Sequence, residues 1–268
     1  MKLKIQLQKQ ISFKKQIQFQ KQTQYQTKIQ RRPPMTAIYK REVKSYFDSM
    51  TGYVFIAFMA LFTGIYFFAY NLNGGYPYFS FTLSALLTIL AFGVPVLTMR
   101  SFADERRSRT DQMLLTAPVG VWEIVIGKYL SMVTVLAVPT ILCLFCPLII
   151  KMAGNGFLMA DYTAILMFFL AGCVFIAIGM FISSLTESQV IAAVGTFGAM
   201  ILIILWPSLT GMMPSGIGTI LANLDIMTMF DNVTSNHILD VSGIILYLSL
   251  AGLFLFFTRQ SIEKRRWS

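Results

Sequence analysis

Charged residues are scarce in this sequence. Only 13% of its 268 residues are Asp, Glu, Lys or Arg, whereas 56% are hydrophobic. Soluble domains carry about a quarter charged residues, so a water-soluble fold of this length would have apolar surface that its polar residues cannot cover. The scarcity excludes an ordinary soluble domain. It indicates a polytopic membrane protein, whose apolar helices have lipid as their solvent.

The chain also lacks the residues that a membrane-embedded enzyme needs. Its single histidine, His237, lies outside the predicted spans, and we expect no ionisable residue near the middle of a span. Cys143 and Cys146 have the spacing of a redox pair, but their apolar neighbours supply no positive charge to stabilise a thiolate. We therefore expect no catalytic residue, no bound cofactor and no metal site in this chain.

Acidic residues are absent from residues 1–34, which hold nine of the 22 lysines and arginines. The net charge of +10 therefore belongs to this low-complexity, Gln- and Lys-rich leader, because the remainder, 35–268, is nearly neutral. The leader has no apolar stretch of signal-peptide type. Three interpretations are open: a disordered tail on anionic lipid headgroups, a nucleic-acid arm, or translated sequence upstream of a start at Met35. We favour the last, since composition changes abruptly at Pro33-Pro34, and expect no nucleic-acid partner.

Six apolar segments are candidates for membrane spans, each of which needs about 20 residues. No charge occurs from Ser49 to Met99, and turn-forming residues at 71–78 divide this run in two. The predicted spans are residues 53–70, 79–99, 126–150, 162–185, 190–206 and 241–258. With both termini in the cytoplasm, Lys151 is the one basic residue outside, which satisfies the positive-inside rule. The sequence therefore predicts an all-α domain over residues 35–268, with six spans and both ends inside.

Two further segments are predicted to form shorter helices. Residues 36–50 place apolar and aromatic side chains on one helical face, which predicts an amphipathic helix lying in the membrane interface before the first span: Tyr39, Val43, Tyr46 and Phe47. A cytoplasmic extension of the first span is the alternative. The apolar segment Pro207–Asp240 is broken by proline and glycine, so it must pack on protein or line a cavity. Outer-leaflet or re-entrant helices fit it best, although an ordinary outer loop remains open.

The loop Arg100–Lys128 is the only substantial charged stretch between spans. Ser101 and Asp104 have the spacing of a helix capping box, and Pro118 would end the helix that follows. A charged helix projecting from two spans can transmit the motion of a partner into the bundle. The alternative is a solvated loop whose charges only set the topology.

Two motifs resemble a known family. One motif resembles the cytoplasmic loop of ABC-2 type transporter permeases, and it matches the gliding-motility-associated branch of that family most closely. Its residues are Glu105…Thr110…Leu114-Leu115-x-x-Pro118…Gly127-Lys128. The segment Gly179–Gln189 is similar to the exit of the fourth span in the same family. The resemblance covers about Met35 to Arg266. One departure is Arg109-Thr110, where a Gly-Thr pair is common.

The resemblance implies a half-transporter that exports its cargo across the cytoplasmic membrane. Two permease copies, identical or different, would meet in the bilayer, and each would seat its loop helix on a separate ATPase subunit that binds ATP and Mg²⁺. The loop residues that it implies as contacts of this coupling site are Glu105, Arg106, Arg107, Thr110, Leu114, Leu115 and Pro118. This chain itself has no P-loop, because Gly127-Lys128 is followed by Tyr129. An ion-coupled secondary transporter, or another polytopic membrane protein, is the alternative.

Overall fold

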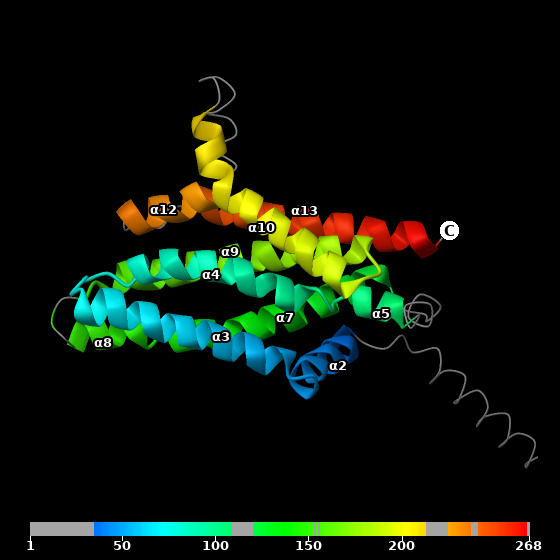
Figure 1. The fold of residues 1–268 in the computed structure, drawn as a ribbon, viewed down its shortest axis with the longest axis horizontal. Coiled ribbons are helices and arrows are strands. Elements are labelled where there is room, and N and C mark those ends of the chain that lie inside the picture. The colour runs from blue at the N-terminus through cyan, green and yellow to red at the C-terminus, as the bar shows by residue number, and fades with distance from the viewer. Residues whose placement is uncertain are drawn as a thin grey trace, which may run out of the picture.

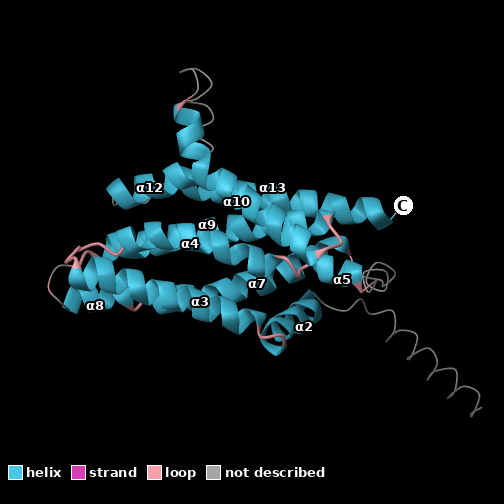
Figure 2. Cartoon of the chain, viewed as in Figure 1, coloured by secondary structure: helices cyan, strands magenta, loops and turns pink. Residues whose placement is uncertain are grey.

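The computed structural model describes residues 35–108, 120–152, 154, 156–212, 225–236 and 241–266. Within these residues every regular element is a helix, as Figure 2 shows. The all-α prediction is confirmed for this part of the chain. The leader 1–34 lies outside it.

The described residues contain six helical segments long and apolar enough to cross a membrane, which confirms the six predicted spans. In the first, α3 (Thr51–Tyr66) continues as a π-helical stretch, η1 (Phe67–Asn73). In the third, α7 (Val121–Cys143) is followed after a tight turn by α8 (Cys146–Met152). The others are α4 (Ser80–Thr98), α9 (Leu158–Leu185), α10 (Gln189–Gly211) and α13 (Val241–Arg266).

Several of these helices extend beyond the predicted spans, α7, α10 and α13 among them. α7 begins at Val121 rather than 126, because the Glu123 carboxylate accepts the Gly120 N–H at 3.3 Å and satisfies a free donor at the first turn. α10 continues through Pro207, and its last turns bend away from the bundle in Figure 1. α13 runs past Thr258, where Arg259 and Glu263 pair across one helical turn at 3.1 Å.

Three shorter helices accompany the spans: α2 (Met35–Asp48), α5 (Ala103–Arg107) and α12 (Ile226–Asn236). In Figure 1, α2, α5 and the last turns of α13 gather at one end of the bundle, whereas α8 and α12 lie at the other. Among the described residues, the first end carries every lysine and arginine except Lys151. We call it the basic end. α12 forms a helix within the segment for which outer-leaflet helices were predicted.

The centre of the bundle is the pair α4 and α9. Within an 18-residue apolar stretch of each of these two spans, 61% and 67% of the residues are buried, against 17% in the corresponding stretch of α10. Glycine lets α9 approach its neighbours, because a Cβ on Gly179 would lie 2.5 Å from Thr98 Oγ1 of α4. At the end far from α5, the Asp161 carboxylate accepts the Phe79 N–H at 2.8 Å. α4 and α9 are therefore joined along their whole length.

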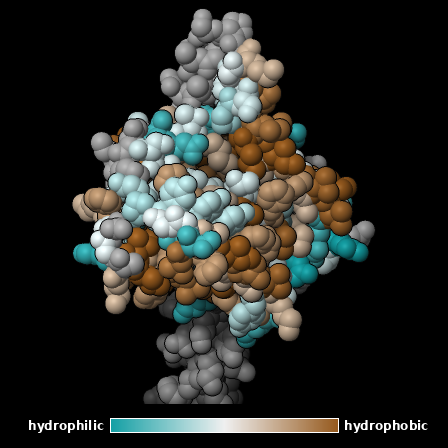
Figure 3. Space-filling view, turned by 60° about the vertical axis from the view of Figure 1, so that its left-hand side comes forward, coloured by the Kyte–Doolittle hydropathy of each residue, from teal (hydrophilic) through white to brown (hydrophobic). Residues whose placement is uncertain are grey.

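The outer helices present large apolar faces. Exposed side chains on α3, α10 and α13 include Leu61, Val194 and Leu248, each more than half exposed. Figure 3 shows such residues in broad brown patches on the visible surface. Surface of this kind is stable only against lipid or another protein.

The close approach of α9 to α4 predicts that Gly179→Ala destabilises the bundle. Thr98 is fully buried and β-branched, so it cannot move aside, and overpacking of this kind costs about 1–3 kcal/mol. The free energy of unfolding in a denaturing-detergent titration measures the loss. Gly198→Ala is the matched control, because nothing lies within 4 Å of the Cβ it would add. Adding Thr98→Ala to Gly179→Ala should restore part of the loss, and equal stability of the two glycine variants would contradict the packing.

Candidate functional site

The candidate site lies at the basic end, where α5 meets α2, α7 and the turn between α9 and α10. Of the loop residues predicted to form a coupling site, Glu105, Arg106 and Arg107 belong to α5. The remaining four lie outside the described residues: Thr110, Leu114, Leu115 and Pro118. The four residues predicted for the amphipathic helix all lie on α2: Tyr39, Val43, Tyr46 and Phe47.

The start of α5 is held by α9. The expected capping box at Ser101 does not form, because Phe102 is the N-cap residue and makes no side-chain cap. Instead, the Ser183 hydroxyl of α9 accepts the N–H groups of Phe102 and Ala103 at 3.2 and 3.3 Å. It also donates to the Met99 carbonyl at 3.4 Å. A hydroxyl of α9 thus satisfies the free donors that a serine at the start of α5 was expected to satisfy.

The turn between α9 and α10 also holds α5. Arg106 is buried, and its guanidinium donates to the Thr186 carbonyl at 3.2 Å. The Gln189 side chain donates to the Asp104 carboxylate. Arg107 is exposed. Two neighbouring arginines therefore differ in position, since Arg106 faces the bundle and Arg107 faces outward.

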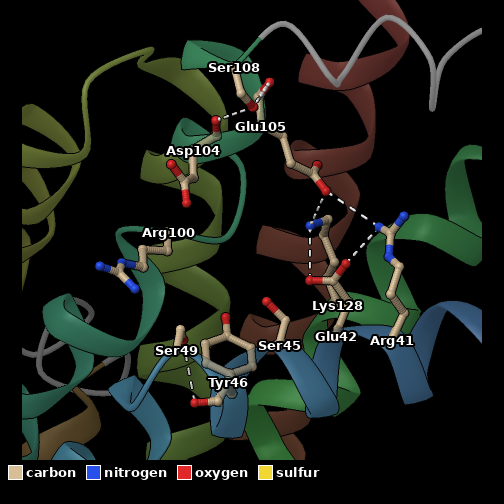
Figure 4. A pocket seen from close by; sticks show the side chains of 10 residues that line it. All are labelled: Arg41, Glu42, Ser45, Tyr46, Ser49, Arg100, Asp104, Glu105, Ser108 and Lys128. Atoms are coloured by element: carbon tan, nitrogen blue, oxygen red, sulfur yellow. Dashed lines mark hydrogen bonds and ion pairs between the residues drawn. The ribbon is translucent and has the colours of Figure 1, made fainter.

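Lys128 is the centre of the site. Its side chain on α7 is 3% exposed and lies between two carboxylates, with Nζ 2.9 Å from Glu105 of α5 and 3.2 Å from Glu42 of α2. Figure 4 shows both contacts converging on the ammonium group. Lys128 also donates to the Ser101 carbonyl at 2.8 Å and lies over the Phe102 ring at 5.2 Å. One buried cation therefore joins three helices.

Arg41 completes the charge balance. Its guanidinium lies 2.7 Å from Glu42 and 3.5 Å from Glu105, so two cations face two carboxylates. Burial raises the pKa of the Glu42 carboxyl, but Lys128 and Arg41 together outweigh it and hold that pKa below its ordinary value of 4.5. Glu42 is therefore ionised at neutral pH.

The apolar face of α2 packs on the bundle. Tyr46 is buried and its hydroxyl donates to the Leu97 carbonyl of α4 at 3.4 Å. Burial and the neighbouring Glu42 and Glu105 raise the pKa of this hydroxyl, which stays neutral. Tyr39 lies 2.9 Å from the Thr134 hydroxyl of α7.

Further contacts fix the orientation of α2. The Phe47 ring meets Tyr53 edge-on at 5.2 Å, and Val43 is half-buried. Ile38 fits against Gly127 of α7, where an added Cβ would lie 3.1 Å from it. The side chains on the face predicted from the spacing are buried or half-buried against the bundle. The charged residues Lys40 and Lys44 are exposed.

A cavity of about 310 Å³ separates α2 from α5 above Tyr46. Arg100 lines one side of it and donates to the Thr51 hydroxyl at 3.0 Å, while Asp104 and Glu105 line the other (Figure 4). On the flank of the cavity, α2 and α5 are joined through the ion pairs of Lys128 and Arg41.

A comparison with family models identifies the family of this chain. The model described as ABC-2 family transporter protein matches residues 2–260. The chain belongs to this family. The match begins at residue 2, so it extends over the basic leader that the motif resemblance did not cover. The comparison with curated proteins gives no match.

Membership makes this ABC-2 transporter chain a multi-pass membrane protein and a transport component rather than an enzyme. The structure brings Glu105 and Arg106 into contacts with the chain's own helices. Sequence reasoning did not single out Lys128 as a site residue, and it entered as part of the Gly127-Lys128 motif. A lysine at the start of an otherwise apolar run is a signal that could have identified it, because such a charge needs partners.

Replacing Lys128 by methionine should destabilise this ABC-2 protein strongly. The substitution keeps the side-chain length but leaves Glu42 and Glu105 facing each other with Arg41 alone, and breaking a buried ion pair costs about 3–5 kcal/mol. The free energy of unfolding measures the effect. Lys44→Met, on the exposed face of α2, is the control. The triple variant Lys128→Met, Glu42→Gln, Glu105→Gln should recover most of the stability, and a Lys128→Met variant as stable as Lys44→Met would refute the role of the lysine.

The depressed pKa of Glu42 predicts acid sensitivity. A carboxyl with a lowered folded-state pKa contributes stability above its ordinary value of 4.5 and loses it as pH falls through the folded value. The unfolding temperature should therefore fall as the pH drops below 4.5 toward the lower folded-state pKa, and less steeply in Glu42→Gln. Glu263→Gln is the control, because the Arg259–Glu263 pair is about one-third exposed and such pairs contribute little. A Glu42→Gln variant with the pH dependence of wild type would contradict the assignment.

Proposed function

We propose that this chain is the permease subunit of an ATP-driven exporter whose ATPase is a separate subunit. The observation that carries the proposal is the anchoring of α5, which the chain's own residues hold on three sides while Arg107 faces outward. Family membership supports a transporter component. The missing P-loop motif supports an ATPase on another chain, which would bind ATP and Mg²⁺.

The anchoring supports a rigid link from the loop into the bundle. α5 is fixed to α9 through Ser183 and to α7 and α2 through Lys128, and α9 packs along the full length of α4. Packed helices move as units, so a displacement of α5 by a partner would shift the central pair rather than only bend a loop. Glu105 and Arg106 then act by holding α5 in place.

The partner would contact the outward side of the loop. We assign this role to Arg107 and, from the motif, to Thr110, Leu114, Leu115 and Pro118. By the positive-inside rule we assign the basic end to the cytoplasm, with α2 at the surface of the cytoplasmic membrane. The exposed apolar faces of α3, α10 and α13 leave room for a second permease copy, identical or different. The gliding-motility-associated branch stays a prediction from the loop motif.

The double substitution Leu114→Asp, Leu115→Asp should abolish binding of the ATPase subunit, because it places charge where apolar side chains would pack against that subunit. The test is co-purification of this chain with the co-expressed ATPase, followed by ATP-driven transport in liposomes. Met159→Asp is the control, since Met159 is 84% exposed on α9 at the opposite end from α5.

We expect the control to retain the ATPase and the Leu114/Leu115 variant to lose both binding and transport. Retention of the ATPase by that variant would refute the proposed contact. Transport by the purified chain without any ATPase, driven by an ion gradient, would replace the proposal with the ion-coupled alternative.

A further inference from the structure

A second cavity lies at the basic end, on the far side of α9 from α5. It is an open groove of about 590 Å³ between the end of α9 and the last turns of α13. Phe181 and Leu185 of α9 and Phe257 of α13 form its apolar wall. Leu185 and Phe257 remain 52% and 41% exposed, so the described part of the chain does not fill the groove.

The α13 side of the groove changes polarity along the helix. Phe257, Gln260, Ser261, Lys264 and Arg265 recur at spacings of three and four residues, so they share one face. The order along that face is apolar, then neutral polar, then cationic. From Phe257 to Arg265 the helix rises about 12 Å. A phospholipid has the same order of groups over a similar length: acyl chain, ester-linked glycerol and phosphate.

The groove also lies at the level of a membrane interface. On the other side of α13, Arg259 stacks over the Trp122 ring at 5.2 Å, and Trp122 is 38% exposed. Tryptophan is enriched where the hydrocarbon meets the headgroups. One turn further along α13, Lys264 and Arg265 would therefore reach the phosphate layer.

The charges of the groove favour an anion. Glu263, the one acid among residues 257–265, lies on the other face and pairs with Arg259 at 3.1 Å. No acid lines the groove in the described part of the chain, while Lys264 and Arg265 are both exposed in it. The cavity beside Lys128 differs, because its cations Lys128 and Arg41 already face carboxylates of the chain and Arg100 donates to Thr51.

We propose that this groove binds one anionic phospholipid from the leaflet at the basic end. The acyl chain lies against Phe181, Leu185 and Phe257, and Lys264 and Arg265 bind the phosphate and headgroup. Basic pockets between spanning helices are known sites for anionic headgroups. The site requires only that the chain spans a membrane, so it does not depend on the proposed ATPase.

Native mass spectrometry of the full chain in detergent tests the site, with titrations of phosphatidylglycerol and of phosphatidylcholine carrying the same acyl chains. Each basic residue near the headgroup contributes a factor of about five in affinity, so Lys264→Gln, Arg265→Gln should weaken phosphatidylglycerol binding about 25-fold. Phosphatidylcholine binding should change little. Lys40→Gln, Lys44→Gln removes the same charge from α2 at the same end and should leave phosphatidylglycerol binding within twofold of wild type.

A single isosteric change guards against misfolding of the double variant. Gln260→Glu adds a negative charge beside the expected phosphate and should also weaken phosphatidylglycerol binding, with an unchanged unfolding temperature. A phosphatidylglycerol analogue with a photoreactive acyl chain should cross-link to Phe181, Leu185 or Phe257.

Three results would overturn the site. The first is wild-type affinity in both groove variants, and the second is an equal loss in the α2 control, which would indicate non-specific surface charge. The third is cross-linking confined to other helices. Protection of the groove by a second protein chain, with no lipid bound there, would also refute the lipid assignment.

Discussion

The buried ammonium group of Lys128 is the interaction on which the basic end depends. A charge that is 3% exposed is stable only with partners, and Lys128 has the carboxylates of Glu42 and Glu105 and the Ser101 carbonyl. Those partners come from α2, α5 and the segment between α4 and α5. Ser101 and Glu105 are close together in the chain, whereas Glu42 is far from both, so satisfying one lysine fixes how α2, α7 and the start of the loop meet. The short helix α5, only five residues long, is held against α2 by this lysine and by the more exposed Arg41–Glu105 pair.

The central helices α4 and α9 connect the fixed position of α5 to the rest of the bundle. Ser183 holds the start of α5, Gly179 lets α9 lie against Thr98, and Asp161 accepts the Phe79 N–H at the opposite end. The outer helices are held less tightly, since only 17% of the residues in the 18-residue apolar stretch of α10 are buried. The molecule therefore has a rigid axis joined to the loop and a periphery with apolar faces for lipid or a second copy. In the proposed function the ATPase acts on that axis.

The sequence predicted the features that composition and spacing control. Six apolar runs gave the six spans, and the residues chosen by spacing on α2, Tyr39, Val43, Tyr46 and Phe47, are buried or half-buried in the structure. Contacts between distant residues could not be read from local pattern. The cap of α5 is supplied by Ser183, about 80 residues along the chain, rather than by Ser101. The part of the coupling motif from Thr110 to Pro118 lies outside the described residues, so its role rests on the resemblance alone.

The central claim is that Lys128 holds α5 in one position relative to α2. Spin labels at Lys44→Cys and Ser108→Cys, both exposed positions, report the distance between these helices by pulsed electron paramagnetic resonance once Cys143, Cys146 and Cys173 are replaced by alanine. The measurement is made in lipid nanodiscs with and without Lys128→Met. We predict one narrow distance distribution with Lys128 present and a broad one in the methionine variant. The same distribution in both proteins would contradict the account.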